Sequence, residues 1–125
     1  MKAKVLIVDD SSLARRTLRH MLEEMGHAVE EATDGEQALE RFYIGAHDLV
    51  ILDMVMNGMY GLEVLEKIRE IKPEARVVVA TADIQQSTAD QVRAAGAKAI
   101  LNKPIKRQEL GRTIGIVLEG GHTWN

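Results

Sequence analysis

Residues Val5–Ser12 read VLIVDDSS and join an apolar run directly to two adjacent aspartates. The run Val5–Val8 contains three β-branched residues, which is typical of a buried strand. Asp9 and Asp10 then end the strand with two carboxylates, which repel each other by ~3 kcal/mol at a separation of ~5 Å and an effective dielectric constant of ~20. A chain that keeps this pair must offset its repulsion, and a nearby cation is the simplest way to do so.

Short apolar runs of the same kind recur along the chain and alternate with segments of helical spacing. The expected strands are Val5–Val8, Ala28–Ala32, Leu49–Leu52, Val77–Ala80 and Ala99–Leu101. The expected helices are marked by residues 13–25, 36–42, 62–68, 84–95 and 110–118. This alternation predicts an α/β fold with a parallel sheet that is covered on both faces. Run 28–32 contains two glutamates, so we expect it at an edge of the sheet.

The first helix has an apolar stripe that repeats every fourth residue. Leu18 and Leu22 widen this stripe, Ser11 or Ser12 is the expected N-cap, and Gly26 is expected to end the helix. The stripe that is expected to face the core therefore combines these two leucines with the residues spaced by four, namely Leu13, Thr17, Met21 and Met25.

Composition limits the functions that are open to the chain. Its 125 residues suit one domain, expected over residues 1–119 with a short tail at 120–125. The net charge of −3 argues against direct nucleic-acid binding, and no apolar run approaches the ~20 residues that a membrane span needs. Cysteine is absent, which excludes disulfides and thiolate chemistry. We expect a cytoplasmic protein with four surface histidines and a mobile Trp124 in the tail.

Polar residues follow four of the expected strands. In an open α/β sheet, ligands bind beyond the carboxyl ends of the strands. The residues expected there are Asp9, Asp10, Asp53, Thr81 and Lys103. Three carboxylates and one ammonium leave an excess of negative charge, which a hard divalent cation such as Mg²⁺ would neutralise. A metal of this kind attracts anions, and a carboxylate beside it can act as a nucleophile and form an aspartyl-phosphate. These residue types favour phosphoryl chemistry at a metal site.

Each of these residues taken alone has a simpler explanation. An Asp-Asp pair after a strand often serves only as a turn and N-cap, and Asp53 before a loop is more often a turn residue than a nucleophile. Thr81 alone carries little information, and Lys103 before Pro104 resembles an ordinary entry to a helix. The argument for a site therefore depends on their joint position at four strand ends.

With these motifs in view, the sequence resembles the receiver domain of bacterial response regulators. The motifs are VLIVDDSS, DLVILDMVMNGMYGLEVLEKIRE, VVVATA and AGAKAILNKPI, in this order, and the resemblance covers about residues 4–118. It implies a doubly wound, flavodoxin-like sheet of five parallel strands in the order 2-1-3-4-5 with five helices. Because the chain stops after the fifth helix, it is similar to the stand-alone members of the chemotaxis-regulator type.

The resemblance also implies a role for each residue of the site. Asp53 matches the phosphoacceptor, Thr81 the switch hydroxyl and Lys103 the lysine that pairs with the phosphoryl group. The implied Mg²⁺ ligands, with Mn²⁺ able to substitute, are Asp10, Asp53, the backbone carbonyl of Val55 and, through water, Asp9. The Lys103–Pro104 peptide bond is expected to be cis.

The resemblance further implies partners and a mode of signalling. The phosphoryl donor would be a phosphohistidine on a histidine kinase or phosphotransfer protein, and the receiver would catalyse its own phosphorylation and dephosphorylation. A target protein is expected to bind the face formed by residues 84–118, and an auxiliary phosphatase is expected to reset the switch. No membrane insertion is expected.

Three positions depart from the pattern of the family. Asn57 stands where a proline is usual, which should loosen the loop. Ile100 stands where an aromatic residue often reports the phosphorylated state. Val55 stands where relatives can carry polar side chains that influence dephosphorylation.

Two other functions remain open from the sequence. The first is a small Mg²⁺-dependent phosphatase of the dehalogenase-like class, although that class spaces its carboxylates as Asp-x-Asp and Asp9 and Asp10 are adjacent. The second is a flavodoxin-like electron carrier, although no Ser/Thr-rich phosphate loop lies beside one of the few aromatic residues. Stoichiometric labelling of Asp53 without steady turnover of substrates distinguishes the signalling function from the phosphatase, and a colourless purified protein excludes the electron carrier.

Overall fold

The computed structural model describes residues 2–56, 60–82 and 85–124; Asn57 and the first residue of the face 84–118 lie outside them. The strands are β1 (Lys4–Val8), β2 (Ala28–Ala32), β3 (Leu49–Asp53), β4 (Val77–Thr81) and β5 (Ala99–Asn102). The helices are α1 (Ser12–Glu24), α2 (Gly35–Gly45), α3 (Gly61–Ile71), α4 (Gln86–Ala94) and α5 (Arg107–Leu118).

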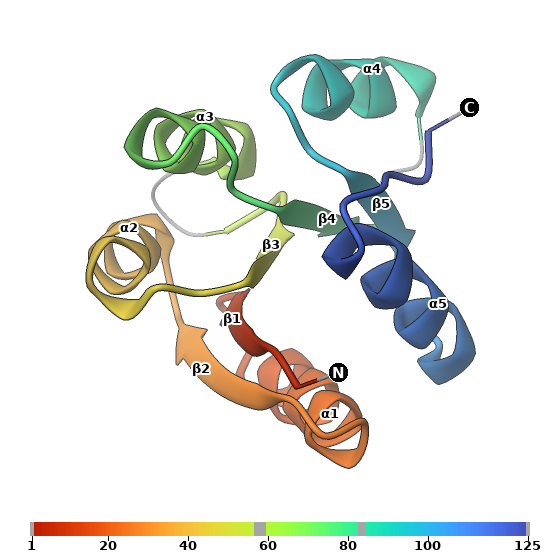
Figure 1. Cartoon of the computed structure of the whole chain (residues 1–125). Helices are drawn as coiled ribbons and strands as arrows, with labels where there is room; N and C mark the ends of the chain where they lie inside the picture. The colour runs from red at the N-terminus through yellow and green to blue at the C-terminus, as the bar shows by residue number, and fades with distance from the viewer. Residues whose placement is uncertain (1, 57–59, 83–84, 125) are drawn as a thin grey trace.

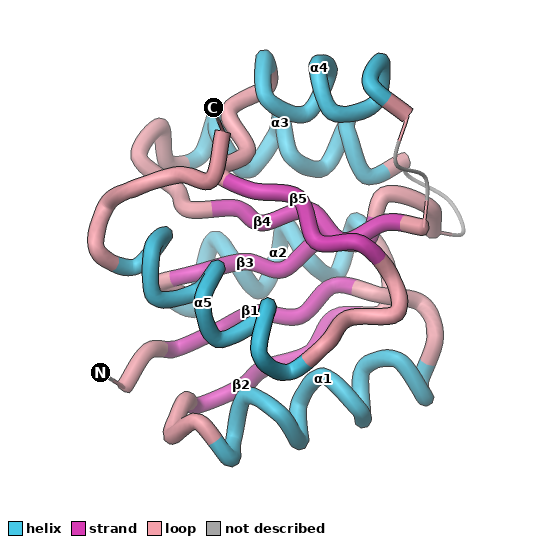
Figure 2. Tube along the Cα trace, turned by 90° about the vertical axis from the view of Figure 1, so that its right-hand side faces the viewer, coloured by secondary structure: helices cyan, strands magenta, loops and turns pink. Residues whose placement is uncertain are grey.

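The five strands form one parallel sheet in the order β2-β1-β3-β4-β5 (Figure 2). This arrangement confirms the predicted fold class and strand order. The more polar β2 lies at one edge, as expected, and β5 lies at the other. The strand order reverses direction between β1 and β3, and in open α/β sheets the ligand crevice lies at such a switch point.

Helices cover both faces of the sheet, with α1 and α5 on one side and α2, α3 and α4 on the other (Figure 1). Adjacent residues of the apolar strands enter opposite cores, because successive side chains of a strand point to opposite faces. Leu6 and Val8 pack with α2 and α3, whereas Val5 and Ile7 pack with α1 and α5. Both faces are apolar because both are buried, which explains the uninterrupted hydrophobic runs in the sequence.

Helix α1 begins at the predicted cap, and only part of its predicted apolar stripe faces the sheet. The hydroxyl of Ser11 accepts a hydrogen bond of 3.2 Å from the backbone N–H of Ala14. The buried residues of α1 are Leu18 and Leu22, whereas Leu13 is 70% exposed, so its assignment to the core was wrong. Residues four apart are offset by about 40° beyond a full turn of a helix with about 3.6 residues per turn. A row of residues spaced by exactly four therefore turns gradually away from the core.

The tail does not project into solvent as the sequence suggested. The indole Nε1–H of Trp124 donates a hydrogen bond of 2.7 Å to the carbonyl of Ala97, and Thr123 N–H donates one of 3.0 Å to Lys98. The guanidinium of Arg93 lies 5.9 Å from the centre of the indole ring. The expectation of a mobile Trp124 was therefore wrong, because a carbonyl 27 residues away in sequence satisfies its N–H group.

One histidine was also misplaced by the sequence analysis. His47 is buried, and its Nε2 lies 2.6 Å from a carboxylate oxygen of Glu30. Its ring stacks on Phe42, with the two ring centres 6.2 Å apart. Burial lowers the pKa of His47 below its ordinary value, although Glu30 opposes this effect.

No helix among the residues that the structure describes is long and apolar enough to span a membrane.

Candidate functional site

The carboxyl ends of β1, β3, β4 and β5 bring the predicted polar residues to one edge of the sheet. Val8 pairs with Leu52, so Asp9 and Asp53 are the next residues on neighbouring strands. Asp53 in turn pairs with Ala80, the residue before Thr81. Thr81 pairs with Asn102, and the N–H of Lys103 donates a hydrogen bond of 2.9 Å to the carbonyl of Thr81. The register of the sheet therefore fixes the positions of these residues along the direction of the strands.

Asp9 is buried, and the structure uses every one of its polar groups. Its N–H donates to Ala32 and continues the β1–β2 ladder. One carboxylate oxygen accepts from the N–H of Ser11 at 2.9 Å, and the other accepts from the ammonium of Lys103 at 2.8 Å. Its backbone carbonyl accepts from Arg15 at 2.8 Å. Asp9 is thereby held in one orientation without any added ion.

Asp53 is the last residue of β3, and its side chain is 10% exposed, which leaves it reachable from the edge of the sheet. One of its oxygens lies 3.4 Å from the ammonium of Lys103 and 3.4 Å from the N–H of Val55, which donates to it. Burial raises the pKa of Asp53, and the negative charge of Asp9 raises it further, whereas Lys103 acts in the opposite direction. The ionised carboxylates of Asp53 and Asp9 therefore repel each other, and a cation in addition to Lys103 would reduce this repulsion.

Lys103 bridges the two buried carboxylates. Burial would lower the pKa of its ammonium, but the hydrogen bond to Asp9 and the charges of Asp53 and Asp9 outweigh burial and raise it. The ammonium is therefore charged near neutral pH. The following peptide bond, Lys103–Pro104, is cis, as predicted.

Three carboxylates converge on the position where a metal ion would balance their charge. Asp9, Asp10 and Asp53 each offer one oxygen, and these oxygens all lie within 4.8 Å of one another. Carboxylate oxygens are the hard ligands that Mg²⁺ prefers, and Mg²⁺ commonly uses one or two of them and completes its shell with water. Lys103 supplies only one positive charge, so the donor set and its charge both fit a divalent cation.

The remaining predicted residues flank this cluster. Thr81 is buried at the end of β4, on the side of Asp53 away from β1. Val55 follows the cluster on the β3–α3 connection, and 67% of it is exposed. Its N–H donates to Asp53, and its side chain offers no polar group.

A close approach of the backbone fixes the chain just beyond Asp53. The N–H of Gly61 donates a hydrogen bond of 3.0 Å to the carbonyl of Met54, at the start of α3. A Cβ atom on Gly61 would lie 2.6 Å from the carbonyl oxygen of Asp53 and 2.6 Å from the Cα of Met54. Only glycine allows α3 to begin so close to β3.

An apolar groove opens beside the cluster and was missed by the sequence analysis. It encloses about 300 Å³, and Asp9, Asp53 and Lys103 lie at its polar end. Its apolar lining comes from α1 and the β5–α5 connection and includes Leu13, Met21 and Ile105. The exposed Leu13 is the signal that could have indicated it, but the sequence alone placed Leu13 in the core.

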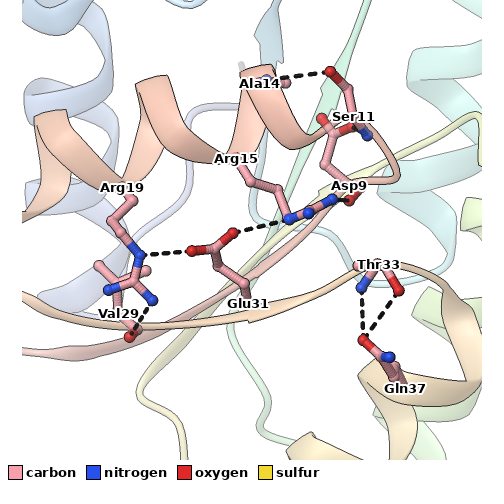
Figure 3. A network of polar contacts seen from close by, with 9 residues as sticks. All are labelled: Asp9, Ser11, Ala14, Arg15, Arg19, Val29, Glu31, Thr33 and Gln37. Atoms are coloured by element: carbon pink, nitrogen blue, oxygen red, sulfur yellow. Dashed lines mark hydrogen bonds and ion pairs between the residues drawn. The ribbon is translucent and has the colours of Figure 1, made fainter.

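A network of ion pairs joins α1 to the edge strand β2 and extends to Asp9 of the acidic cluster (Figure 3). The Nε–H groups of Arg15 and Arg19 donate to the two carboxylate oxygens of Glu31, at 2.8 and 2.6 Å. Arg15 also donates to the carbonyl of Asp9. Burial would raise the pKa of Glu31, but its hydrogen bonds to Arg19 and Arg15 outweigh burial and lower it. This network was not predicted from the sequence, in which a glutamate within a strand is its signal.

Comparison with known proteins places the chain among signalling proteins. A family model for the response regulator receiver domain matches residues 5–115. The chain is 35% identical to the chemotaxis protein CheY of Thermotoga maritima over 107 residues, which cover 85% of this chain and 89% of that protein. It is 34% identical to CheY of Bacillus subtilis, with 94% of this chain and 99% of that protein covered.

Other relatives show the same domain within a longer chain or in a solved structure. The autoinducer 2 sensor kinase/phosphatase LuxQ of Vibrio vulnificus is 38% identical over 86% of this chain, which spans only 13% of the length of LuxQ. The solved structure of TrrA from Thermotoga maritima, in complex with Mg²⁺-BeF, is 36% identical with a TM-score of 0.83. It covers 92% of this chain and 97% of TrrA.

The fold, the acidic cluster at its switch point and the match over residues 5–115 lead to one conclusion. The chain belongs to the family of response regulator receiver domains, the phosphorylation-switched signalling modules of two-component systems.

Proposed function

We propose that this receiver accepts a phosphoryl group on Asp53 from a phosphohistidine of a histidine kinase or phosphotransfer protein. The observation that carries the proposal is the convergence of Asp9, Asp53 and Lys103, with the ammonium 2.8 Å from one carboxylate and 3.4 Å from the other. A buried carboxylate paired with a lysine and set among other carboxylates suits a nucleophile that must also bind a cation.

The proposed metal is Mg²⁺, for which Mn²⁺ can substitute. Asp10 and Asp53 would bind it directly, together with the backbone carbonyl of Val55, and Asp9 would act through a water molecule. Bound there, the ion supplies positive charge to the oxygens of the phosphoryl group. The oxygens of the acidic cluster lie close enough together to share one ion, which supports this assignment.

In the proposed transfer, the residues of the chain position the reacting groups. A carboxylate oxygen of Asp53 attacks phosphorus, and the new O–P bond forms as the P–N bond to the donor imidazole breaks. The imidazole nitrogen keeps the electron pair and takes up a proton. Lys103 is already beside Asp53 and would pair with a phosphoryl oxygen, while the hydroxyl of Thr81 would donate to another.

The apolar groove beside the cluster supports docking of a protein donor. It leads from the exposed Leu13 on α1 to Asp53, so a helix lying against it would bring its histidine to the acidic edge. A small acyl phosphate would need no such contact. The groove would therefore determine which protein donates and how fast, without altering the chemistry.

Output would pass through binding of a target protein to the face of α4, β5 and α5. Ile100 lies in this face on β5 and is half-buried, packed against the core beneath α3 and α4. The phosphoryl group should be long-lived, because Val55 has no side-chain group that orients an attacking water molecule. An auxiliary phosphatase partner would then reset the switch.

The proposal is tested by incubation of the purified protein with a small acyl phosphate, with and without Mg²⁺, followed by intact-mass measurement. We expect one phosphoryl group per chain in the presence of Mg²⁺, and none in Asp53→Asn. Steady turnover of many phosphate esters without a stoichiometric adduct would instead indicate a phosphatase. Equal labelling of Asp53→Asn would overturn the proposal.

A further inference from the structure

Asp9 and Asp10, which would orient and bind the metal, are joined by one peptide bond, and the side chain of Arg15 holds that peptide group from outside the cluster. The carbonyl of Asp9 belongs to the Asp9–Asp10 peptide group. It accepts a hydrogen bond of 2.8 Å from Nη1 of Arg15, one turn into α1. The plane of this peptide group determines the direction in which Asp10 leaves the strand.

Arg15 is itself held on its other side. Its Nε–H donates to Glu31 at 2.8 Å, and Glu31 is fixed in turn by Arg19 at 2.6 Å (Figure 3). The side chain of Arg15 is only 14% exposed, so water competes weakly for its donors. A guanidinium can make both contacts at once because its N–H groups form a rigid fork, whereas a lysine has a single nitrogen.

We propose that Arg15 is a positioning residue for the metal, which acts by fixing the Asp9–Asp10 peptide group so that the Asp10 carboxylate is directed at Asp53. This inference rests on the proposed function, because it assigns Arg15 a part in the same site. Arg15 does not contact the metal. By holding this peptide group in place beforehand, Arg15 reduces the conformational entropy that the turn at Asp10 loses when the ion binds.

The proposal predicts an effect opposite in sign to that of simple electrostatics. Arg15 is a cation beside an acidic site, so its removal should tighten Mg²⁺ binding if charge alone matters. Positioning predicts weaker binding. The test is titration of Mg²⁺ alone into the full chain, followed by the amide NMR shifts of residues 10–12. We expect Arg15→Gln to raise the dissociation constant several-fold, and Arg15→Lys to restore the charge without restoring the affinity.

Two matched variants separate positioning from other effects. Arg16 is exposed and belongs to none of the ion pairs found among the described residues, so Arg16→Gln measures the effect of charge alone. Arg19→Gln breaks the far end of the same network but leaves the contact between Arg15 and Asp9. We expect Arg19→Gln to lower thermal stability without weakening Mg²⁺ binding.

Each outcome decides the matter. Unchanged or tighter binding by Arg15→Gln would overturn the inference, as would equal weakening in Arg19→Gln, which would indicate a merely structural role. Recovery of wild-type affinity in Arg15→Lys would also overturn the inference as stated, because a single nitrogen would then replace the guanidinium fork. Failure of the wild-type chain to bind Mg²⁺ at all would overturn the proposed metal site itself, and the inference with it.

Discussion

At the scale of single residues, the carboxylates of Asp9 and Asp53 are held in fixed orientations by their contacts. Lys103 partly neutralises both carboxylates, and backbone N–H groups satisfy further lone pairs. Burial and the charge of Asp9 nevertheless destabilise the ionised form of Asp53, and they raise the pKa of its carboxyl. The folded protein without a bound cation therefore favours the protonated form of Asp53 more than the unfolded chain does.

This imbalance makes the effect of Asp53→Asn on stability depend on pH. Because the pKa of Asp53 is raised on folding, its ionised form destabilises the fold at pH values above that raised pKa. The penalty disappears as pH falls through the raised pKa and below the ordinary value of 3.8. We expect Asp53→Asn to increase the free energy of unfolding at neutral pH by about 1 kcal/mol, the relief being partly offset by the lost pairing with Lys103.

Denaturant unfolding of both proteins in Mg²⁺-free buffer checks this expectation. The difference in the free energy of unfolding should shrink as the pH is lowered. A difference that stays constant with pH, or a variant less stable than the wild type at neutral pH, would contradict the assignment of a strained carboxylate to Asp53.

The sequence could predict that the residues of the site lie at one edge of the sheet, because their position depends only on where the strands end. Asp9, Asp53 and Thr81 follow apolar runs directly and Lys103 follows one after Asn102, and parallel strands bring their carboxyl ends to one edge whatever the details of packing. The contacts of Arg15 could not be predicted in this way. They depend on how α1 is rotated against β1 and β2, and the predicted apolar stripe, which wrongly included the exposed Leu13, did not give that rotation closely enough.

At the scale of elements, the start of α3 is fixed against the end of β3. Gly61→Ala would push a Cβ into the backbone of Asp53 and Met54, which cannot yield as a flexible side chain would. We expect a loss of about 2 kcal/mol in the free energy of unfolding, within the usual cost of overpacking, together with slower phosphorylation by acyl phosphate because Asp53 is displaced.

Gly115 provides the matched control for this substitution. It lies within α5, and a Cβ there would meet nothing within 4 Å. Gly115→Ala should stabilise the protein by ~0.5–1 kcal/mol, since alanine is the better helix former, and should leave phosphorylation unchanged. Equal effects of the two substitutions on phosphorylation would show that the close approach at Gly61 does not position Asp53.

The groove along α1 leads to a prediction about the protein donor. Leu13→Glu should slow transfer from a phosphohistidine donor by about tenfold, equivalent to ~1.4 kcal/mol, because it places a charge in an apolar contact. Labelling by a small acyl phosphate should not change. Ile44→Glu is the control, since Ile44 is a comparably exposed residue of α2 outside the groove. Loss of transfer in both variants, or in neither, would show that the groove is not part of the surface that binds the donor.

The elements themselves were predicted closely where they depend on local pattern. The predicted bounds of β2 agree with the structure, and the other strands extend by one residue at one end. The prediction failed where distant parts of the chain decide the packing. Trp124 docks on the α4–β5 connection and His47 is buried against Glu30, and neither contact is visible in the sequence around these residues.

At the scale of the whole molecule, the proposed switch must couple the acidic cluster to the proposed target-binding face. Thr81 is the last residue of β4, and α4, which forms part of that face, is the next helix along the chain. Ile100 lies on β5 and cannot perform the rotation of an aromatic ring, because a β-branched side chain is small and stiff at χ1. We therefore expect the signal to depend on Thr81 and only weakly on Ile100.

Amide NMR with and without phosphorylation distinguishes the two residues. Thr81→Ala should still accept the phosphoryl group but lose most of the shift at residues 82 and 85–87, whereas Ile100→Ala should keep it. Trp124 contacts Arg93 of α4 and Ala97, so its fluorescence offers an independent report on the same region. The account of the switch is wrong if Ile100→Ala abolishes the response and Thr81→Ala preserves it.

The identity of the phosphorylated residue is the central claim, and chemical trapping measures it most directly. An aspartyl-phosphate is reduced by borohydride to homoserine, which marks the modified position in a peptide map. After phosphorylation with acyl phosphate and Mg²⁺, the account predicts homoserine at residue 53 and unmodified aspartate at residues 9 and 10. Homoserine at residue 9 or 10, or a phosphorylated chain without homoserine at residue 53, would contradict it.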